Sequence, residues 1–416
     1  LHLSLRRQRQ MCIRDRNRHS WKKRLQSLVL VLLSLNLSLL GLSSIVLADS
    51  EATEESTVVA QDSSSDSNGH QSGQNVGTSQ DVDAKAAIAM DAKTGQILYQ
   101  KNAQKRYPVA STIKILTLAV IEKDIQAHKL SWDQKVTISH PVAVMANDWR
   151  FSNVPLNEGE SYTIKSLVDS MMLVSADGSA EALALADAGS VAKFNAKMQQ
   201  VAKEAGVTDA KIYNMIGLSN GDLGTLRLKN VSKNAENQIS AVDLAKIASW
   251  LLNHYPDVVN ITKTAQEDFP VSDSQTYHMQ NINLMIKGAA LDRADGEIDG
   301  LKTGTTDSAG NCFVSTGTFN NRRLVTVVLN VSGDFNNQFQ QTNNLYNRVL
   351  GRFAPQTIKK GALIKVGQKK ARAAKTTTLW LPKDTKLEKK TIKIKGTLKG
   401  SKLTPNDMPQ VALKLK

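Results

Sequence analysis

The sequence predicts an α+β fold, in which an antiparallel sheet flanked by helices is followed by a small all-β domain. Two short apolar runs near residue 90 and three more between residues 302 and 331 have the length and composition of strands. Between these groups, apolar residues recur with helical periodicity. After Pro355 apolar residues alternate with lysines in the two-residue period of strands, which predicts the second domain.

The first 48 residues have the composition of an export leader. Trp21-Lys-Lys-Arg24 precedes an apolar run over residues 25–47, and the small Ala48 follows, which is the order of a secretory signal peptide. We expect cleavage after Ala48, with an uncleaved membrane anchor as the alternative because the run is long enough to span a bilayer. Either outcome predicts export, to the cell wall or the outer face of the cytoplasmic membrane. The first 20 residues precede a complete basic region, and we expect them to be adapter or non-coding sequence.

Residues 49–81 are rich in Ser, Asp, Glu and Gln and contain no Lys or Arg. Such a stretch buries too little apolar surface to offset the entropy of ordering, so we predict a disordered linker. A larger domain over residues 82–355 and a basic all-β domain over residues 356–416 complete the predicted organisation. Because the sequence stops within a strand-like pattern, we expect the last domain to be truncated.

The elements of the larger domain are predicted in chain order. A turn at residues 92–95 joins strands at residues 86–91 and 96–99. Helices are expected after Ser111 and over residues 164–174, 180–188 and 241–252, and strands are expected from Lys302, over 311–316 and over 324–331. The two early and three late strands can form one antiparallel sheet with helices on both faces.

The formal charge of +15 is concentrated at the two ends of the chain. Residues 1–48 carry nine basic residues and one acidic residue, residues 356–416 carry seventeen and three, and the remainder is net negative by about seven. The charge therefore gives no support for nucleic-acid binding. The basic C-terminal domain fits contact with anionic lipid or wall phosphates, and it equally fits a solvated sheet face at residues 376–381 and 391–395.

Cysteine and histidine give no sign of a metal site, and we expect neither a metal nor a cofactor. The two cysteines are Cys12, in the leader, and Cys312, which excludes an intramolecular disulfide in the mature chain and a cysteine-based zinc cluster. We expect Cys312 to pack as a small strand residue. The seven histidines show no metal-ligand spacing, and His140 and His278 are expected in loops or on the surface.

The chemistry is concentrated in the segment Tyr107-Pro-Val-Ala-Ser-Thr-Ile-Lys114 and the apolar run that follows it. Ser111 and Lys114 are three residues apart, so on a helix their side chains can touch. A lysine carried into a core helix loses hydration, which lowers its pKa and makes its amine a base for the serine hydroxyl. Taken alone, this spacing also fits a helix N-cap serine with an exposed lysine.

Two later motifs decide between these interpretations. Ser175-Ala-Asp177 follows an apolar run, and Lys302-Thr-Gly304 opens a predicted strand. Ser-x-x-Lys, Ser-x-Asn/Asp and Lys-Thr-Gly in this order form the signature of penicillin-binding proteins and class A β-lactamases. Over residues 84–416 the chain resembles exported D-alanyl-D-alanine carboxypeptidases of the low-molecular-mass penicillin-binding protein type.

The resemblance implies a reaction and a nucleophile. Ser111 would attack the carbonyl between the two terminal D-alanines of a peptidoglycan stem peptide, and Lys114 would accept its proton. Ser175 would relay a proton to the leaving amine. Water would then hydrolyse the acyl-enzyme. β-Lactam antibiotics are expected to acylate the same serine.

The resemblance also implies how the substrate is held. Lys302 would face the free carboxylate of the substrate, with the hydroxyls of Thr303 and Thr305 nearby. The backbone N–H groups of Ser111 and Thr305 would form the oxyanion hole, and Gly304 would let the strand approach the substrate closely. Asn214, Gly217 and Leu218 match a family turn near this site, where we expect a turn-forming role.

Asp177 departs from the pattern, because the resembled family usually has asparagine at this position. A carboxylate here can pair with Lys114 or Lys302, and such a charge would hold the lysine protonated and oppose its role as a base. It would also repel a substrate carboxylate. Shifting the motif to Ser179-Ala-Glu181 does not restore an asparagine.

Two other functions remain open. A class A-like β-lactamase shares the serine and lysine but needs a glutamate to activate water for deacylation, and residues 211–217 contain no acid. The second alternative is a catalytically impaired wall-binding homologue, which Asp177 and the basic C-terminal domain favour. The intact Ser111/Lys114 pair and Lys302-Thr-Gly304 favour the carboxypeptidase, because binding alone does not require them.

Overall fold

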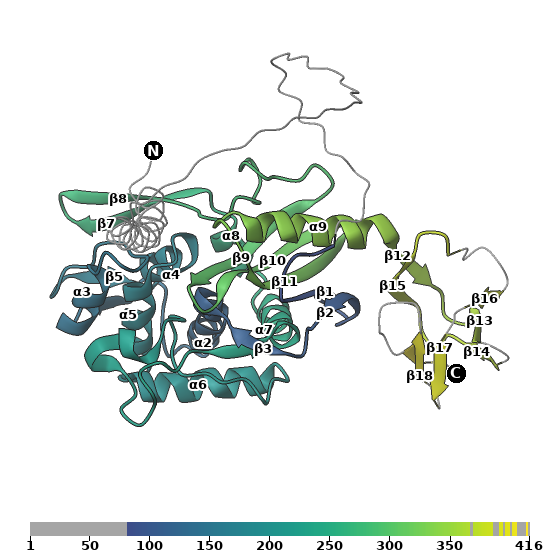
Figure 1. The fold of residues 1–416 in the computed structure, drawn as a ribbon, viewed down its shortest axis with the longest axis horizontal. Helices are drawn as coiled ribbons and strands as arrows, with labels where there is room; N and C mark the ends of the chain where they lie inside the picture. Colours follow the sequence, from purple (N-terminus) through teal and green to yellow (C-terminus); the bar gives the residue numbers. More distant parts are fainter. Residues whose placement is uncertain are drawn as a thin grey trace, which may run out of the picture. The chain divides into compact units, whose positions relative to one another are not determined.

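The computed structural model describes residues 81–366, 369–385, 391–393, 396–399, 402–405 and 413–414 (Figure 1). The predicted leader, Cys12 and the linker up to residue 80 lie outside these residues. The side chains described in the C-terminal region are those of residues 356–363 and 372–385. No helix within the described ranges is both long enough and apolar enough to cross a membrane.

One five-stranded antiparallel sheet forms the centre of the larger domain, as predicted. Its strand order is β2-β1-β11-β10-β9, so the two N-terminal strands lie beside the three late ones. The bounds are β1 Ala86–Asp91, β2 Ile97–Lys101, β9 Glu297–Thr306, β10 Gly310–Phe319 and β11 Arg322–Val331. Strand β9 is at one edge, next to the segment that carries Ser111.

Alternation along the strands gives the sheet two buried faces. In β1, Ile88 packs into the cluster that holds the helices α2 and α7, whereas Ala87 and Ala89 pack into the cluster that holds α9. The helix bounds are Lys114–Gln126 for α2, Ala241–His254 for α7 and Asn337–Arg352 for α9. Figure 1 shows α9 on one side of the sheet and α7 on the other. The prediction of helices on both faces is therefore confirmed.

The remaining helices form a lobe around α2. They are α3 His140–Ala146, α4 Ile164–Leu173, α5 Asp177–Ala188, α6 Val191–Glu204, α8 Val258–Thr262 and the 3₁₀ segments η1 Ala110–Ile113 and η2 Asn220–Leu226. Every residue of α2 from Lys114 to Ile121 is buried, so the prediction of a core helix after Ser111 is confirmed. Helix α5 begins at Asp177, three residues before the predicted start.

Short strand pairs cover the margins, and sequence patterning did not predict them. The pairs are β3 Arg106–Pro108 with β6 Gln238–Ser240, β4 Lys135–Thr137 with β5 Ser161–Thr163, and β7 Gln266–Ser272 with β8 Gln275–Gln280. The strands β3, β4, β5 and β6 have three residues each, which offers too few positions for an alternation to be recognised.

The C-terminal region consists of strands, as predicted. Its bounds are β12 Phe353–Ile358, β13 Leu363–Val366, β14 Lys369–Arg372, β15 Thr377–Pro382, β16 Thr391–Lys393, β17 Gly396–Lys399, β18 Lys402–Pro405 and β19 Leu413–Lys414. Strand β12 pairs antiparallel with β15, whereas β13 pairs parallel with β16.

Strand β15 is joined to the larger domain through Trp380. Its side chain is fully buried among the residues of the α9 cluster, and its indole Nε1 donates to Asp91 Oδ2 at 2.8 Å. Gln96 bonds both the backbone N–H and the carbonyl of Trp380, at 3.0 and 2.8 Å. The core of the larger domain therefore includes a side chain from the C-terminal region.

Candidate active site

Ser111 lies on the 3₁₀ turn η1, just before α2, and Lys114 is the first residue of that helix. The sequence predicted both residues on one helix, and the i, i+3 contact exists across this junction. Lys114 Nζ lies 2.7 Å from Ser111 Oγ. Ala110, directly before the serine, has a φ of 47°, which an L residue rarely adopts. The turn is thus held in a conformation that the local sequence does not favour.

Lys114 is completely buried and its ammonium group faces four oxygen atoms. Besides Ser111, these are Asp177 Oδ1 at 2.5 Å, the carbonyl of Ile216 at 3.1 Å and Ser175 Oγ at 3.4 Å. An ammonium group has three N–H donors, so these acceptors more than satisfy it. The alternative of an exposed lysine beside a capping serine is therefore excluded.

Asp177 pairs with Lys114, one of the two lysines named as its possible partners. Burial lowers the pKa of Lys114 and raises the pKa of Asp177, because each charged form loses hydration. Their mutual attraction opposes both shifts. The two groups therefore titrate as a coupled pair, and the protonation of Asp177 affects the charge state of Lys114.

Ser175 is placed by the junction between two helices. Helix α4 ends at Leu173 and α5 begins at Asp177, and Ser175 between them has a φ of 65°. This left-handed conformation is unusual for serine. The junction brings Ser175 Oγ within 3.4 Å of Lys114 Nζ, although the two residues are 61 positions apart in the chain.

Lys302 is on edge strand β9, with its side chain buried in the interior. Its Nζ donates to the carbonyl of Thr303 at 3.1 Å. Burial lowers the pKa of Lys302 well below its usual range, and the nearby charge of Lys114 acts in the same direction. A ligand carboxylate at this position would reverse that shift by favouring the ammonium form. Thr303 is buried, whereas Thr305 is exposed and bonds to Asn311 at 3.1 Å.

Two glycines, one on β9 and one in the turn of residues 214–218, let these segments pack closely against the backbone of η1. A Cβ at Gly304 would lie 2.8 Å from the backbone nitrogens of Ser111 and Thr112. A Cβ at Gly217 would lie 2.0 Å from the carbonyl oxygen of Ala110, and Gly217 has a φ of 96°. At Gly304, strand β9 therefore lies close to the backbone of η1.

The turn near Gly217 also supplies an acceptor that the sequence analysis missed. Asn214 Oδ1 accepts from the N–H groups of Ile216 and Gly217, and its Nδ2 donates to Leu218, which confirms the turn-forming role. The carbonyl of Ile216 then accepts from both Lys114 Nζ and Ser111 Oγ, at 3.1 and 3.3 Å. Every residue type has a backbone carbonyl, so the sequence does not reveal which carbonyl accepts here. The match of residues 214–218 to a family turn was the only indication that this segment lies near the site.

Glu181 is a second missed feature. It lies one helical turn after Asp177 on α5, it is 1% exposed, and neither carboxylate oxygen has a hydrogen-bond partner. Burial and the charge of Asp177 raise the pKa of Glu181 well above its usual value. An unpaired buried carboxyl group of this kind is expected to remain protonated.

Other titratable residues lie apart from this cluster. Cys312 is a buried β10 residue opposite Gly304, as expected, and burial raises the pKa of its thiol to about 12. The side chains of His140 and His278 are exposed and pair with Glu158 and Asp268. Among the described residues, no group of three or more His, Cys, Asp or Glu is placed to hold a metal ion.

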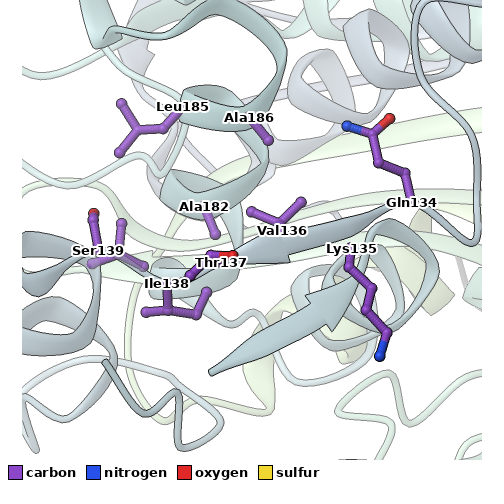
Figure 2. A pocket seen from close by; sticks show the side chains of 10 residues that line it. Gln134, Lys135, Val136, Thr137, Ile138, Ser139, Ala182, Leu185 and Ala186 are labelled. Atoms are coloured by element: carbon purple, nitrogen blue, oxygen red, sulfur yellow. The ribbon is translucent and has the colours of Figure 1, made fainter. Parts of the chain in front are cut away.

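A cavity of about 320 Å³ lies between β4 and helix α5 (Figure 2). Figure 2 shows Ala182, Leu185 and Ala186 of α5 on one side of it and Val136 and Ile138 on the other. None of the predicted site residues lines it. We therefore assign the chemistry to the cluster around Ser111.

Comparison with solved structures identifies the fold as that of the penicillin-binding proteins. A peptidoglycan synthesis regulatory factor (PBP3) from Streptococcus pneumoniae is 29% identical, with a TM-score of 0.66, over 81% of this chain and 98% of that chain. Penicillin-binding protein D2 from Listeria monocytogenes, solved with ampicillin bound, has the same fold at 24% identity and a TM-score of 0.52, over 65% of this chain and 98% of its own.

The chain belongs to the D-alanyl-D-alanine carboxypeptidase family, whose model matches residues 73–333. The D-alanyl-D-alanine carboxypeptidase DacF of Bacillus subtilis is 28% identical over 250 residues, which are 60% of this chain and 58% of that protein. DacC of Escherichia coli is 27% identical over 256 residues, or 61% of this chain and 58% of that protein. The matched region thus spans less than two thirds of these relatives.

Proposed function

We propose that this protein is a serine-type D-Ala-D-Ala carboxypeptidase that removes the terminal D-alanine from peptidoglycan stem pentapeptides. The buried contact of 2.7 Å between Ser111 Oγ and Lys114 Nζ carries this proposal. A serine hydroxyl attacks a carbonyl only when a base takes its proton, and Lys114 is the basic group in contact with it. Membership of the D-alanyl-D-alanine carboxypeptidase family supports this substrate class.

Acylation begins with attack by Ser111 Oγ on the carbonyl carbon between the two D-alanines. Lys114 accepts the hydroxyl proton, and the backbone N–H groups of Ser111 and Thr305 stabilise the oxyanion. The C–N bond then breaks, Ser175 passes a proton to the departing D-alanine amine, and an ester remains on Ser111. Water hydrolyses the ester and releases the shortened peptide.

Asp177 contributes to the first of these steps through Lys114. When Asp177 takes the shared proton, both groups are neutral and the amine is free to act as a base. Burial favours these neutral forms. The carboxylate would therefore modulate the base strength of Lys114 in a site where the family usually has a neutral amide.

Lys302 would bind the carboxylate at the end of the substrate, with Thr303 and Thr305 beside it. Its buried amine gains a counter-charge when this carboxylate arrives. β-Lactams carry a comparable carboxylate and a strained amide, so the same groups are expected to direct penicillin to Ser111. The bound ampicillin in the Listeria relative supports this expectation.

The composition of the two terminal regions supports a cellular location and contacts outside the active site. The leader at residues 1–48 supports export to the cell wall or the outer face of the membrane, where the stem peptides are. The excess of basic residues over residues 356–416 supports contact with wall phosphates or anionic lipid. The change in composition after Pro355 supports a boundary between enzyme and basic domain near residue 355, although Trp380 from beyond it packs into the larger domain.

Two competing functions have specific support. The ion pair of Lys114 with Asp177 favours an impaired wall-binding homologue, because a lysine held protonated cannot accept the serine proton. The shared serine and lysine favour a class A-like β-lactamase, whose acyl-enzyme is short-lived. Each alternative predicts a different fate for penicillin.

Intact-mass analysis after exposure of residues 49–416 to benzylpenicillin tests the proposal. We expect one covalent penicillin that persists, no adduct on Ser111→Ala, and release of D-alanine from a peptide ending in D-Ala-D-Ala. An adduct that disappears rapidly would indicate the lactamase. No adduct and no D-alanine release by the unmodified chain would contradict the enzyme and favour the wall-binding homologue.

A further inference from the structure

Helix α5, whose first residue is Asp177, has no capping side chain at its start. Its N-cap residue is Ala176, which has no polar side-chain atom to accept from the first turn. Asp177 and Gly178, the first two residues, are buried, so their N–H groups need acceptors from elsewhere in the protein. The segment that supplies these acceptors also fixes the carboxylate that pairs with Lys114.

Both acceptors come from the loop that follows α3. The N–H of Asp177 donates to the carbonyl of Ser152 at 2.9 Å, and the N–H of Gly178 donates to Asn153 Oδ1 at 2.8 Å. The other end of the same amide is also used, because Asn153 Nδ2 donates at 2.8 Å to the carbonyl of Met145 in the last turn of α3. One side chain therefore joins the end of α3 to the start of α5.

The two helix ends are also in close contact beside this bridge. A Cβ at Gly178 would lie 2.6 Å from the Cβ of Ala146 and 2.9 Å from its Cα, so the backbone of α5 packs directly on the end of α3. This contact leaves the start of α5 no space to move toward α3. The hydrogen bond from Gly178 to Asn153 opposes movement in the other direction.

We propose that Asn153 is a positioning residue that holds the carboxylate of Asp177 against Lys114 and thereby sets the strength of the base that activates Ser111. This inference rests on the proposed function and extends it to a residue that acts through Asp177. The carboxylate oxygen lies 2.5 Å from Lys114 Nζ. Coulomb attraction varies inversely with distance, so a separation of about 5 Å would halve it. A small displacement of α5 would therefore change how strongly Lys114 holds its proton.

The pH profile of penicillin acylation tests this role with two variants of Asn153. Asn153→Ala loses both hydrogen bonds, so the carboxylate is held less closely and the protonated lysine is less favoured. We expect the midpoint to move down by about 0.5 pH unit, half of the shift of about one unit expected for Asp177→Asn. Asn153→Asp keeps the acceptor for Gly178 and adds a negative charge near the ion pair, which should move the midpoint up.

The other charged groups around Asp177 are the same in these variants, so a shift of the midpoint reports a change at the ion pair. On the elements packed around the start of α5 they are Lys302 of β9, Glu181 of α5, the ion pair of Asp148 with Arg150 in the loop, His140 with Glu158 next to α3, and Lys165 with Asp169 on α4.

A double variant and a matched control separate positioning from general loss of structure. In the Asp177→Asn background, Asn153→Ala should cause no further shift, because the carboxylate that it positions is absent. The control is Asn253→Ala, since Asn253 Nδ2 on α7 donates at 2.8 Å to the carbonyl of Ala92, and this change should leave the midpoint where it is. Circular dichroism establishes that each variant is folded.

Three results would overturn the positioning role. They are an unchanged midpoint in folded Asn153→Ala, a downward shift in Asn153→Asp, and a shift by Asn153→Ala that is as large in the Asp177→Asn background as in the unmodified chain. If Asn153→Ala does not fold, Asn153→Asp decides the question, because it keeps the bond to Gly178.

NMR titration of the Asp177 carboxyl carbon distinguishes failure of this role from failure of the proposed function, because it needs no reaction with penicillin. The signal is assigned by its absence in Asp177→Asn. Weaker attraction to Lys114 raises the pKa of the Asp177 carboxyl, so the titration midpoint should be higher in Asn153→Ala than in the unmodified chain. An equal midpoint would contradict the positioning role even if no penicillin adduct forms on Ser111.

Discussion

At the scale of single residues, the charge of Asp177 sets how readily Lys114 gives up its proton. The carboxylate lies 2.5 Å from the ammonium and favours the charged lysine. In Asp177→Asn this attraction is lost while burial still acts, so the pKa of Lys114 falls further. We expect the midpoint of the pH profile for penicillin acylation to move down by about one pH unit, with a roughly tenfold faster reaction below the original midpoint.

The measurement is the second-order acylation rate constant between pH 5 and pH 10. Asp268→Asn, a change of an exposed aspartate on β7, is the matched control and should leave the profile unchanged. An unchanged midpoint in Asp177→Asn would show that the ion pair with Asp177 does not determine the pKa of Lys114. A slower reaction at every pH would show that the carboxylate itself is needed.

Glu181 gives a second prediction at this scale, for stability. Burial raises its pKa in the folded protein well above the usual 4.5, whereas the unfolded chain ionises near 4.5. Its stabilising effect is therefore complete below pH 4.5 and is lost as the pH rises toward the folded pKa. Glu181→Gln has no ionisable carboxyl group at this position, so its stability does not decrease in this way as the pH rises. Its free energy of unfolding relative to the unmodified chain should increase by about 1.4 kcal/mol per pH unit above pH 4.5.

Urea denaturation at pH 4, 5, 6 and 7 measures this difference. Glu297→Gln, at an exposed position at the start of β9, serves as the control and should show no such slope. A difference between Glu181→Gln and the unmodified chain that is the same at all four pH values would mean that Glu181 is ionised in the folded protein.

Sequence reasoning reached some of these residues and not others for identifiable reasons. The three-residue spacing of Ser111 and Lys114 determines that they can touch, and the apolar run after them predicts the burial of Lys114. The pairing of Asp177 with Lys114 was one of two foreseen options. The Ile216 carbonyl and the unpaired state of Glu181 depend on how distant segments meet, and neither is encoded in a local pattern.

At the scale of elements, the 3₁₀ turn η1 is held between β9 and the turn of residues 214–218. Gly304 and Gly217 make these contacts possible because a side chain at either position would strike the backbone of η1. We expect Gly304→Ala to reduce penicillin acylation at least about 100-fold, since displacement of Ser111 misaligns both the nucleophile and its backbone N–H.

Gly351→Ala is the control for this change, because a Cβ there meets no atom within 4 Å. It should leave the acylation rate unchanged. Circular dichroism establishes that both variants are folded before rates are compared. A folded Gly304→Ala protein with an ordinary acylation rate would show that η1 can shift without loss of geometry.

The patterning that predicts elements also explains which ones were missed. The apolar runs of β1 and β11 and the apolar periodicity of α7 are long enough to specify these elements. The 3₁₀ form of η1 was not predicted, because it depends on the positive φ of Ala110, which the contacts of Gly217 and Gly304 hold in place. The pairs of β3 with β6 and of β4 with β5 arise in the same way, from packing between segments that are far apart in the chain, whereas β7 and β8 form a local hairpin.

At the scale of the whole molecule, Trp380 joins the C-terminal region to the first strand of the sheet. The indole donates to Asp91, which also pairs with Arg322 at 2.7 Å. Trp380→Phe retains most of the packing but loses this hydrogen bond to a charged group, and we expect it to lower the free energy of unfolding by about 1.5–3 kcal/mol. Trp380→Ala also leaves a cavity, for an expected loss of about 3–5 kcal/mol.

Urea denaturation should show the lower free energy of unfolding of both Trp380 variants. The penicillin acylation rate of the folded variants should be unchanged. The reason is that Trp380 packs in the cluster on the α9 face of the sheet, whereas Val109 and Ile113, which flank Ser111, pack in the cluster on the opposite face. Trp250→Phe, a partly buried tryptophan on α7, controls for the loss of an indole. A slower acylation in folded Trp380→Phe would mean that the two faces are coupled.

The position of Trp380 bears on where the larger domain ends. The composition change after Pro355 predicts a boundary there, yet β15 lies beyond it and fills the core of the preceding residues. A chain of residues 82–355 lacks Trp380 and leaves Asp91 without one of its donors. We expect it to be at least as unstable as Trp380→Ala, whereas residues 82–385 should retain the indole contact and unfold at a higher urea concentration. Equal stability of the two chains would support the boundary at residue 355.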